Sequence, residues 1–515
     1  MSEQKVGYAW IVENLRLKTT RSFLPAKVTA STRALHNLGD QLLVPPHIAP
    51  SDEDPISHLE FALKHQKVDL ESIQAASLAL DPAHVQARIN ERPSGLYLRQ
   101  IGVLFEHFTG HSLDVSSPTA KYVDLFDDSY YICGVARRNA KYRVNVNGLG
   151  PLSYCPIVRR TPAITRLVAR DLFADLDRFV ESVGGTKHLD RALGWAYLDE
   201  TRGSFQIERD PPSDDRARRF VQLLHQAHQG MPLTEAYLAE LQSSIIRSPH
   251  HQEVAFRHQQ NWLASASRSA AVNVTYIPPA PEPLEALMAD FMAFANAPAQ
   301  GDGNNALIKA MLVSFGFVFN HPFMDGNGRI SRFLVHHSLC RAGVLQQGLI
   351  LPISVAMQHH EGDYLSALKS VSAPIRDLWE VAVIDERALR TTFNGSADPY
   401  RYWDATATVE FGLQMAHYAL DHSLLEESEF LKRFDIARKA VERSYDIQNR
   451  DVVNLVRMAY DTRGVLSKNR RKQFADRVEP EVLDAIERAV TAAFFPDIDI
   501  EPVAVTKPNA DESTR

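Results

Sequence analysis

Apolar residues recur at helical spacing along most of the chain, and short alternating segments interrupt this pattern in the first third. Residues 56–110 carry two or three amphipathic segments that predict helices. The segments SYYICGVA and KYRVNVNGL alternate apolar and polar residues beside Asn and Gly, which is typical of strands joined by turns. Helical periodicity returns with AITRLVARDLFADLDRFVESVGG, continues to about Ser372, and resumes over 385–497. The pattern predicts a mainly α fold.

The same pattern divides the chain into four parts. We place a first boundary near Pro162, so that an α+β region of unknown role, 1–162, precedes a helical core at 163–375. A helical C-terminal domain is expected at 385–497. The polar segment 498–515 is expected to be disordered, because it lacks the apolar residues that a core requires.

Composition adds only loose bounds on function. The chain has 515 residues, a net charge of −7 and 45% hydrophobic residues, which is typical of globular proteins and demands no nucleic-acid or membrane partner. The longest apolar run, Leu307 to Phe319, is shorter than the roughly 20 residues of a membrane span and predicts a buried helix. The first residues lack a secretion signal, and three scattered cysteines form no disulfide or zinc pattern. We therefore expect a cytoplasmic protein.

One twelve-residue segment, HPFMDGNGRISR at 321–332, concentrates candidate chemistry between two predicted helices. Gly326 and Gly328 allow a tight turn whose N–H groups can approach an anion, and the following helix adds its positive N-terminal end. Arg329 and Arg332 lie three residues apart, so they can share a helix face and bind successive phosphates. The segment predicts a phosphate-binding loop.

Three further side chains in this segment suggest what the loop does. Asp325 is a hard oxygen ligand suited to Mg²⁺, and His321 can accept a proton near neutral pH. Phe323 is expected to anchor the loop in the core. Together these residues indicate nucleotide-dependent transfer onto a hydroxyl group. An arbitrary Asp-Gly-Asn-Gly sequence would usually be only a turn.

The segment resembles the signature of the Fic family, His-x-Phe-x-Asp/Glu-Gly-Asn-Gly-Arg-x-x-Arg. All eight defined positions are present: His321, Phe323, Asp325, Gly326, Asn327, Gly328, Arg329 and Arg332. The sequence from Phe256 resembles the flap hairpin of the family, and LILPISVAMQHHEGDYLSALKSVS resembles the segment that closes the Fic core. The similarity covers about 190–375, so the resemblance implies a Fic helical core with a β-hairpin flap within 163–375. A plain surface hairpin is the alternative for the flap.

The resemblance implies a protein AMPylator that uses ATP and Mg²⁺ to modify a Tyr, Thr or Ser hydroxyl of a target protein. His321 would take the hydroxyl proton and Asp325 would hold Mg²⁺. Asn327 and the loop N–H groups would stabilise the α-phosphoryl oxygens, and the two arginines would bind the leaving pyrophosphate. Self-modification, a homodimer and removal of AMP are compatible with the family.

Other reactions remain open at this stage. Fic relatives also transfer UMP, phosphocholine or a phosphate, and the motif does not read the base. A second class of function is a regulatory module that holds nucleotide while flanking domains bind a partner such as DNA. The target, the base preference and the oligomeric state cannot be read from the sequence.

Upstream of the core, ETRGSFQIERD resembles the inhibitory helix of the family, Ser/Thr-x-x-x-Glu-Gly/Asn, near 190–210. Ser204 and Glu208 occupy the two defined positions, and Arg209 stands where Gly or Asn is expected. The resemblance implies that Glu208 pairs with Arg332 and inhibits the site, unless it is an ordinary surface glutamate. The departure at Arg209 leaves the helix end and the strength of inhibition open.

Three other patterns suggest chemistry that we do not favour. GDGNNA at Gly301 fits a dinucleotide fingerprint but follows no strand. The basic run KNRRKQF at Lys468 reads as a solvated helix start in an acidic chain. Adjacent histidines point apart on a helix, so we expect solvated or packed side chains instead of metal ligands at three pairs: His250/His251, His336/His337 and His359/His360.

Overall fold

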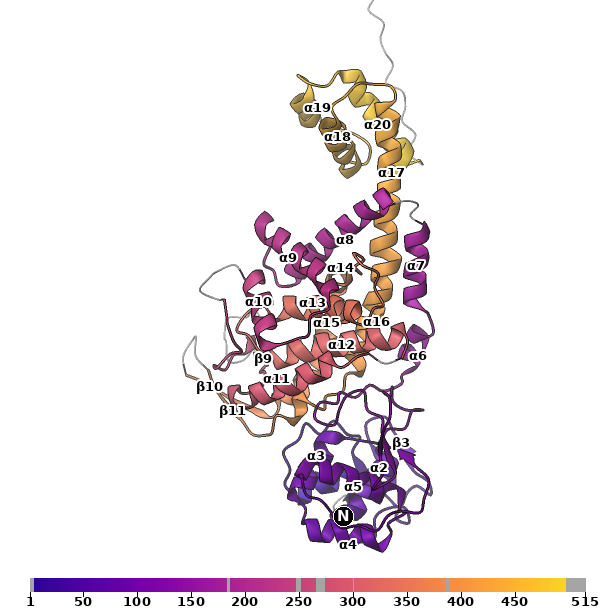
Figure 1. Cartoon of the computed structure of the whole chain (residues 1–515), viewed down its shortest axis with the longest axis vertical. Coiled ribbons are helices and arrows are strands. Elements are labelled where there is room, and N and C mark those ends of the chain that lie inside the picture. Colours follow the sequence, from indigo (N-terminus) through magenta and orange to yellow (C-terminus); the bar gives the residue numbers. More distant parts are fainter. Residues whose placement is uncertain are drawn as a thin grey trace, which may run out of the picture. The chain divides into compact units, whose positions relative to one another are not determined.

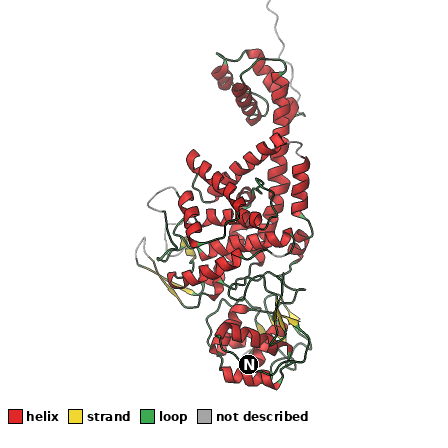
Figure 2. Cartoon of the chain, in the orientation of Figure 1, coloured by secondary structure: helices red, strands yellow, loops and turns green. Residues whose placement is uncertain are grey.

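The computed structural model describes residues 4–182, 186–246, 252–264, 274–299, 301–384 and 389–496. Helices dominate, and strands occur in the N-terminal region and in two hairpins (Figures 1 and 2). The mainly α fold is therefore confirmed. Backbone contacts divide the chain into two compact units: Met1–Arg178 with Ala196–Leu420, and Phe179–Trp195 with Asp421–Arg515. The boundaries expected near Pro162 and at 375–385 fall within the first unit.

The N-terminal region combines helices with two small sheets, as predicted. Its helices are α1 (Tyr8–Asn14), α2 (Pro55–His65), α3 (Leu70–Ala79), α4 (Pro82–Glu91) and α5 (Leu96–Thr109). One sheet has the order β1 (Lys5–Val6), β2 (Ala26–Val28), β4 (Leu42–Val44), β3 (His36–Asn37), with β2 and β4 parallel. The other has the order β5 (Val123–Asp124), β7 (Val144–Val146), β6 (Arg137–Asn139). Asp54, Asp69 and Asp81 cap α2, α3 and α4 by accepting backbone N–H groups of the first turn.

One of the two predicted strand segments forms no regular strand. KYRVNVNGL contains β7, but SYYICGVA forms a single bridge, between Tyr131 and Arg159. Its amides bond to two different segments, since Ile132 donates to Val158 O and Gly134 donates to Asn147 O. A continuous ladder with one neighbour therefore does not form, although the residues alternate as in a strand.

A helical block surrounds the loop at 321–326. Before the loop lie α6 (Pro162–Val168), α7 (Leu172–Ser182), α8 (Thr186–Ile207), α9 (Asp214–Gln226), η1 (Ala227–Gln229), α10 (Glu235–Ile245), α11 (Pro281–Asn296) and α12 (Gly303–Asn320). After it lie α13 (Asn327–Arg341), α14 (Ile353–His359), α15 (Glu361–Arg376) and α16 (Thr406–Tyr418). The apolar run Leu307 to Phe319 forms the body of α12, and most of its side chains are buried, as predicted. Helices α12 and α13 pack against each other, so the loop between them is held at its two ends by buried helices (Figure 1).

The segment after the core contains a hairpin that the helical pattern did not predict. Strands β10 (Trp379–Val383) and β11 (Leu389–Phe393) pair antiparallel, and η3 (Asp398–Tyr400) follows. The second compact unit contains α17 (Leu425–Glu442), α18 (Asn449–Asp461), α19 (Lys468–Phe474) and α20 (Pro480–Phe494) around its own apolar core, after the π-helical turn η4 (Ala419–Leu424). KNRRKQF is a short helix capped by Ser467, and the tail expected at 498–515 lies outside the described residues.

Candidate functional site

The twelve-residue segment lies between α12 and α13, which confirms the predicted helix-loop-helix arrangement. His321 ends α12 in the left-handed region, with φ 45°, and Gly326 caps α13 with φ 88°. Left-handed backbone is natural for glycine and costs a bulkier side chain energy. The loop therefore turns twice within six residues, and it brings the end of one buried helix to the start of the next.

His321 is buried, with 7% of its surface exposed, and its ring is oriented by the helix that precedes it. Its Nδ1 lies 3.1 Å from Val318 O, so Nδ1 carries the proton and donates to that carbonyl. Burial lowers the pKa of His321 to about 4. The ring is therefore neutral near pH 7, and its Nε2 presents a lone pair that can accept a proton.

Asn327 holds the loop closed from within. Its side-chain amide donates to Phe323 O at 2.7 Å and its Oδ1 accepts from Phe323 N at 3.0 Å. Phe323 is fully buried and lies beside Phe256 and Phe317, as expected of an anchor. Both polar groups of Asn327 thus bond to the backbone of Phe323. In this structure its side chain positions the loop, whereas the family resemblance assigned it to phosphate.

Arg329 is buried at the start of α13 and bridges two carboxylates. Its Nη1 lies 2.9 Å from Asp210 Oδ2, and its Nη2 lies 3.1 Å from Asp325 Oδ1. The guanidinium also lies over the Phe205 ring, 5.3 Å from its centroid. Hydrogen bonds from Arg216, and then the charges of Arg216 and Arg329, lower the pKa of Asp210. The sequence assigned no role to Asp210, although it is the last residue of the inhibitory-helix segment ETRGSFQIERD and follows Glu208 by two positions.

Arg332 is 1% exposed and is bound to the end of α8. It donates to Ser204 Oγ at 2.9 Å, to Ser204 O at 2.7 Å and to Glu208 Oε1 at 2.9 Å. Its Nη1 is buried and makes no hydrogen bond within the described residues. The predicted pairing of Glu208 with Arg332 is thus present in the structure.

Glu208 also lies against the backbone at the start of α13. A Cβ added at Gly328 would stand 2.1 Å from Glu208 Oε1 and 3.3 Å from Arg332 Nη1. The carboxylate therefore occupies the space beside the amide cradle in which a phosphate would be held. Glu208 directly follows α8, and the next residue, Arg209, has φ 53°. This left-handed position explains why the pattern expects Gly or Asn at that place.

Asp325 is the acidic residue of the loop, and about half of its side chain is exposed. Its Oδ1 accepts the N–H of Gly326 at 2.6 Å as well as the Arg329 contact. Within the described residues no group of three His, Cys, Asp or Glu side chains could enclose a metal ion. An exposed single carboxylate beside a phosphate cradle fits Mg²⁺, which binds through one or two carboxylates together with substrate phosphates.

Arg257 connects the loop to the segment before it, and sequence reasoning did not single it out. Its Nε donates to His321 O at 2.9 Å, its backbone N–H donates to Pro322 O at 2.8 Å, and its Nη1 donates to Gln259 O at 3.0 Å. Burial lowers its pKa to about 10. The strands of the expected flap, β8 (Leu263–Ala264) and β9 (Val274–Tyr276), pair antiparallel just beyond it, and 265–273 lie outside the described residues.

The adjacent histidines that the structure describes are packed or bonded to other side chains and to backbone. His336 Nε2 lies 3.0 Å from the fully buried carboxylate of Glu200, which also accepts from Ser354. His337 Nε2 lies 2.7 Å from Met231 O. His359 Nδ1 lies 3.2 Å from the Tyr418 hydroxyl. The pair His250/His251 lies outside the described residues.

Comparison with known proteins found similarity in the part of the chain that contains this loop. Residues 232–339 match the model of the Fic/DOC family. A protein adenylyltransferase Fic of Culex quinquefasciatus is 36% identical over 89 residues, which cover 17% of this chain and 16% of that protein. The corresponding protein of Drosophila mojavensis is 41% identical over 68 residues, 13% of each chain. The chain thus aligns with less than a fifth of the length of these relatives.

Two solved structures were also similar to the chain. A Fic family protein from Desulfovibrio desulfuricans G20 is 18% identical with a TM-score of 0.40, covering 63% of this chain and 89% of that one. A Fic domain containing signaling protein from Bacteroides thetaiotaomicron VPI-5482 is 16% identical with a TM-score of 0.36, covering 52% and 97%. The segment 232–339, which matches the Fic/DOC family, contains the complete motif.

Proposed function

We propose that the protein transfers AMP from ATP to a Tyr, Thr or Ser hydroxyl of a target protein. The observation that carries this proposal is the arrangement of one loop, in which a buried neutral histidine and two buried arginines flank a glycine-rich helix start. The names of the relatives, which match over short segments, agree with it. Such a site can hold a nucleotide and accept a proton from an incoming hydroxyl.

In this reaction the target oxygen attacks the α-phosphorus, and the bond from that phosphorus to the α–β bridging oxygen breaks. His321 Nε2 takes the hydroxyl proton, and pyrophosphate leaves. The contact of Nδ1 with Val318 O keeps the lone pair on Nε2, and the low pKa keeps the ring neutral. A general base of this kind contributes typically 10² to 10⁴ in rate.

The phosphates would be held at the start of α13. The N–H groups near Gly326 and Gly328 and the helix dipole favour negative charge there, and Arg329 and Arg332 supply charge-assisted hydrogen bonds. Asp325 would hold Mg²⁺, which would supply charge neutralisation when bound. Asn327 acts through Phe323 by fixing the loop, since its amide is already bonded there.

Glu208 is proposed to inhibit this reaction. Its carboxylate is bonded to Arg332 and stands against Gly328, so it competes with an ATP phosphate for both the cation and the space. A nucleotide that enters while Glu208 remains in place would be held in a pose unfit for attack. Removal of Glu208 leaves the cation and the cradle free for the phosphate.

The test is incorporation of radioactivity from ATP into protein, with the full chain and a native lysate as the source of targets. Incorporation is measured as the excess over the same lysate with the His321→Ala variant, which should abolish transfer while the chain remains folded and binds ATP. Label on the α-phosphate is expected to enter protein in this excess, whereas label on the γ-phosphate is not. Excess incorporation of γ-label would show phosphorylation, and excess incorporation from UTP alone would show UMP transfer. Either result would overturn AMP transfer.

A further inference from the structure

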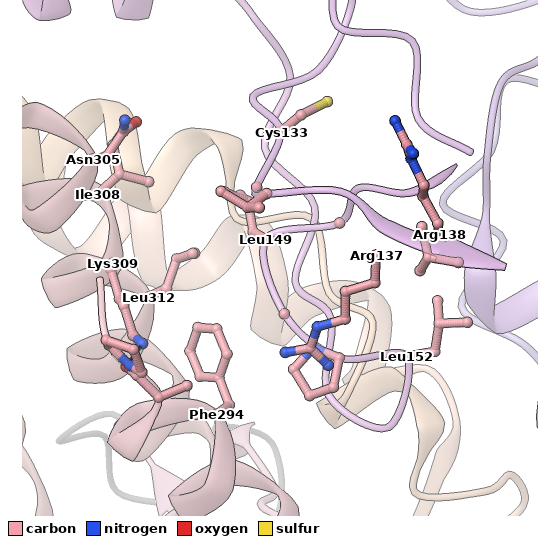
Figure 3. Close-up of a pocket in the computed structure, with 18 of the residues that line it drawn as sticks. Cys133, Arg137, Arg138, Leu149, Leu152, Phe294, Asn305, Ile308, Lys309 and Leu312 are labelled. Atoms are coloured by element: carbon pink, nitrogen blue, oxygen red, sulfur yellow. Dashed lines mark hydrogen bonds between the residues drawn. The ribbon is translucent and has the colours of Figure 1, made fainter. Parts of the chain in front are cut away.

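A cavity lies in the first compact unit, away from the loop at 321–326. It has a volume of about 380 Å³ and is bordered by β6, the loop that follows β7, the end of α11 and one face of α12 (Figure 3). None of residues 321–332 lines it. Lys309, in its wall, precedes His321 by twelve residues, which is about 18 Å along a helix. The cavity is therefore separate from the nucleotide loop.

The described residues that line this cavity include cationic side chains and no carboxylate. In Figure 3 Lys309 and Arg137 lie on either side of the Phe294 ring, while Arg138 points away from it. The Arg138 guanidinium lies over the Tyr122 ring, 5.4 Å from its centroid. Neither Arg137 nor Lys309 forms an ion pair with a carboxylate in the described part of the chain. Three cationic side chains, Lys309, Arg137 and Arg138, thus line the cavity. The first two lie beside Phe294 without a compensating carboxylate, and the guanidinium of the third is directed to Tyr122.

Lys309 is held in an environment that favours an incoming anion. Its ammonium group donates to Ala297 O and lies 5.4 Å from the Phe294 centroid. Burial, and then the charge of Arg341, lower its pKa to about 8. Burial removes water that would stabilise the charge of the Lys309 ammonium group, and an anion beside it would stabilise that charge instead. Charge-assisted hydrogen bonds are about twice as strong as neutral ones.

The remaining wall is apolar and firmly held. Phe294, Ile308 and Leu312 are buried residues of α11 and α12, and Leu149 faces them from the loop after β7. A Cβ added at Gly150 would stand 2.9 Å from the Phe294 ring, so this loop approaches α11 closely. The same part of the chain is fixed to residues after β11, since Cys155 N donates to Arg401 O and Tyr402 Oη donates to Leu152 O. The cavity is therefore a preformed space.

We propose that this cavity binds a small organic anion, with its acidic group between Arg137 and Lys309 and an aromatic or aliphatic body against Leu149, Phe294 and Leu312. The volume lies within the range of about 300 to 1,000 Å³ for small-molecule sites, which combine apolar walls with a few placed polar groups. A bare phosphate ion would leave the apolar wall unfilled. The chemistry of the walls therefore selects a compact carboxylate, sulfonate or phosphate ester that carries a ring or chain.

The probe is 8-anilinonaphthalene-1-sulfonate, an aromatic anion whose fluorescence rises when it binds in an apolar site. Its neutral counterpart is N-phenyl-1-naphthylamine, which has the same aromatic body without the sulfonate. Titration of the full chain should show saturable binding of the anionic dye in the presence of saturating ATP and Mg²⁺. Displacement of the dye by ATP would place it in the nucleotide loop and would overturn the proposal.

Variants locate the bound dye. Arg137→Gln, at an exposed strand position, and Lys309→Met should each weaken binding of the anionic dye by about ten-fold or more, since each removes a charged hydrogen-bond donor. Binding of the neutral dye should stay unchanged. Arg33→Gln is the control, because it removes an equal charge from an exposed residue of the same unit that does not line the cavity. Equal affinity of the wild type and Arg137→Gln for the anionic dye, or an equal loss in Arg33→Gln, would overturn the proposal.

Discussion

Glu208→Gly should convert the protein from a restrained to an active transferase. The carboxylate lies 2.9 Å from Arg332 Nη2, and the Arg332 side chain is 1% exposed. Loss of one partner usually strands a buried charge at considerable cost. Here the phosphate of ATP takes the place of the carboxylate, and Ser204 continues to accept from Arg332. The variant should therefore fold normally and bind ATP in the productive pose.

The size of the gain follows from the contact that ATP no longer has to displace. A hydrogen bond to a charged group contributes about 1.5 to 3 kcal/mol, and each 1.4 kcal/mol changes an equilibrium ten-fold. A competing phosphate that must first displace Glu208 binds more weakly by the same factor. Transfer should thus rise about ten-fold to a hundred-fold. The lower end is expected, because Glu208 is one-third exposed and water screens part of the interaction.

The assay is the initial rate of self-modification or target modification with α-labelled ATP at matched protein concentrations. Gln206→Gly is the matched control, since it places the same helix-weakening residue on the exposed side of the last turn of α8 and leaves Glu208 in place. Adding His321→Ala to Glu208→Gly should remove the gain. Equal rates for wild type and Glu208→Gly, or an equal gain in Gln206→Gly, would refute the inhibitory role of this carboxylate.

Four further predictions concern the loop, buried histidines and the end of α8. The kcat/KM of transfer should be constant from pH 8 to about 5 and should fall near pH 4, because the pKa of His321 in the free protein is about 4. An inflection of kcat/KM near pH 6.5 would contradict this assignment. Burial also lowers the pKa of His58 and His337 to about 4, so the unfolded chain binds more protons between pH 6.5 and 4, and Tm measured by calorimetry should fall as pH decreases through this window. Asn327→Ala should lower both the free energy of unfolding and transfer, because it strands buried groups of Phe323; a stable Asn327→Ala variant would show that the amide serves the phosphate instead. Asp325→Ala should leave the free energy of unfolding within about 1 kcal/mol of wild type and weaken the Mg²⁺ dependence of transfer. Arg209→Gly should stabilise the chain by up to about 1 kcal/mol in urea unfolding. Relief of the left-handed backbone at φ 53° is worth roughly 1 to 2 kcal/mol, and the greater unfolded-state entropy of glycine offsets about 0.4 to 1 kcal/mol of it. The variant should also lower basal transfer by holding Glu208 more firmly; higher basal transfer would separate the helix end from inhibition.

The sequence predicted those parts of the site that depend on local spacing. The order of α12, loop and α13, the burial of Leu307 to Phe319 and the position of Glu208 opposite Arg332 all followed from periodicity or from a motif with fixed offsets. Apart from the pairing of Glu208 with Arg332, which the motif supplied, contacts between distant segments were not predicted. Arg257 donates to His321 O from 64 positions away, and nothing in the local sequence distinguishes it from a surface arginine. The hairpin β10–β11 was missed since the helical pattern on both sides outweighed five residues of alternation.

The role of Asn327 shows where motif reasoning stops. A motif records that a residue type is required at a position, and the chemistry of an amide fits both a phosphate oxygen and a backbone turn. Only the distances decide between them, and here both amide groups are within 3.0 Å of Phe323 backbone atoms.

The two motif arginines are both bonded to residues 204–210, at the end of α8 and just after it. Binding of nucleotide is therefore coupled to the position of this segment. Arg332 bonds to Ser204 and Glu208, while Arg329 bonds to Asp210, which lies just after the left-handed turn at Arg209. Asp210 is fixed in turn by two bonds from Arg216 on α9. A nucleotide that displaces Glu208 therefore moves one end of a short segment whose other end is held by buried arginines. The cost of displacement rests on how readily the backbone around Arg209 changes conformation, which is why the residue at this one position should set the strength of inhibition as much as the glutamate does.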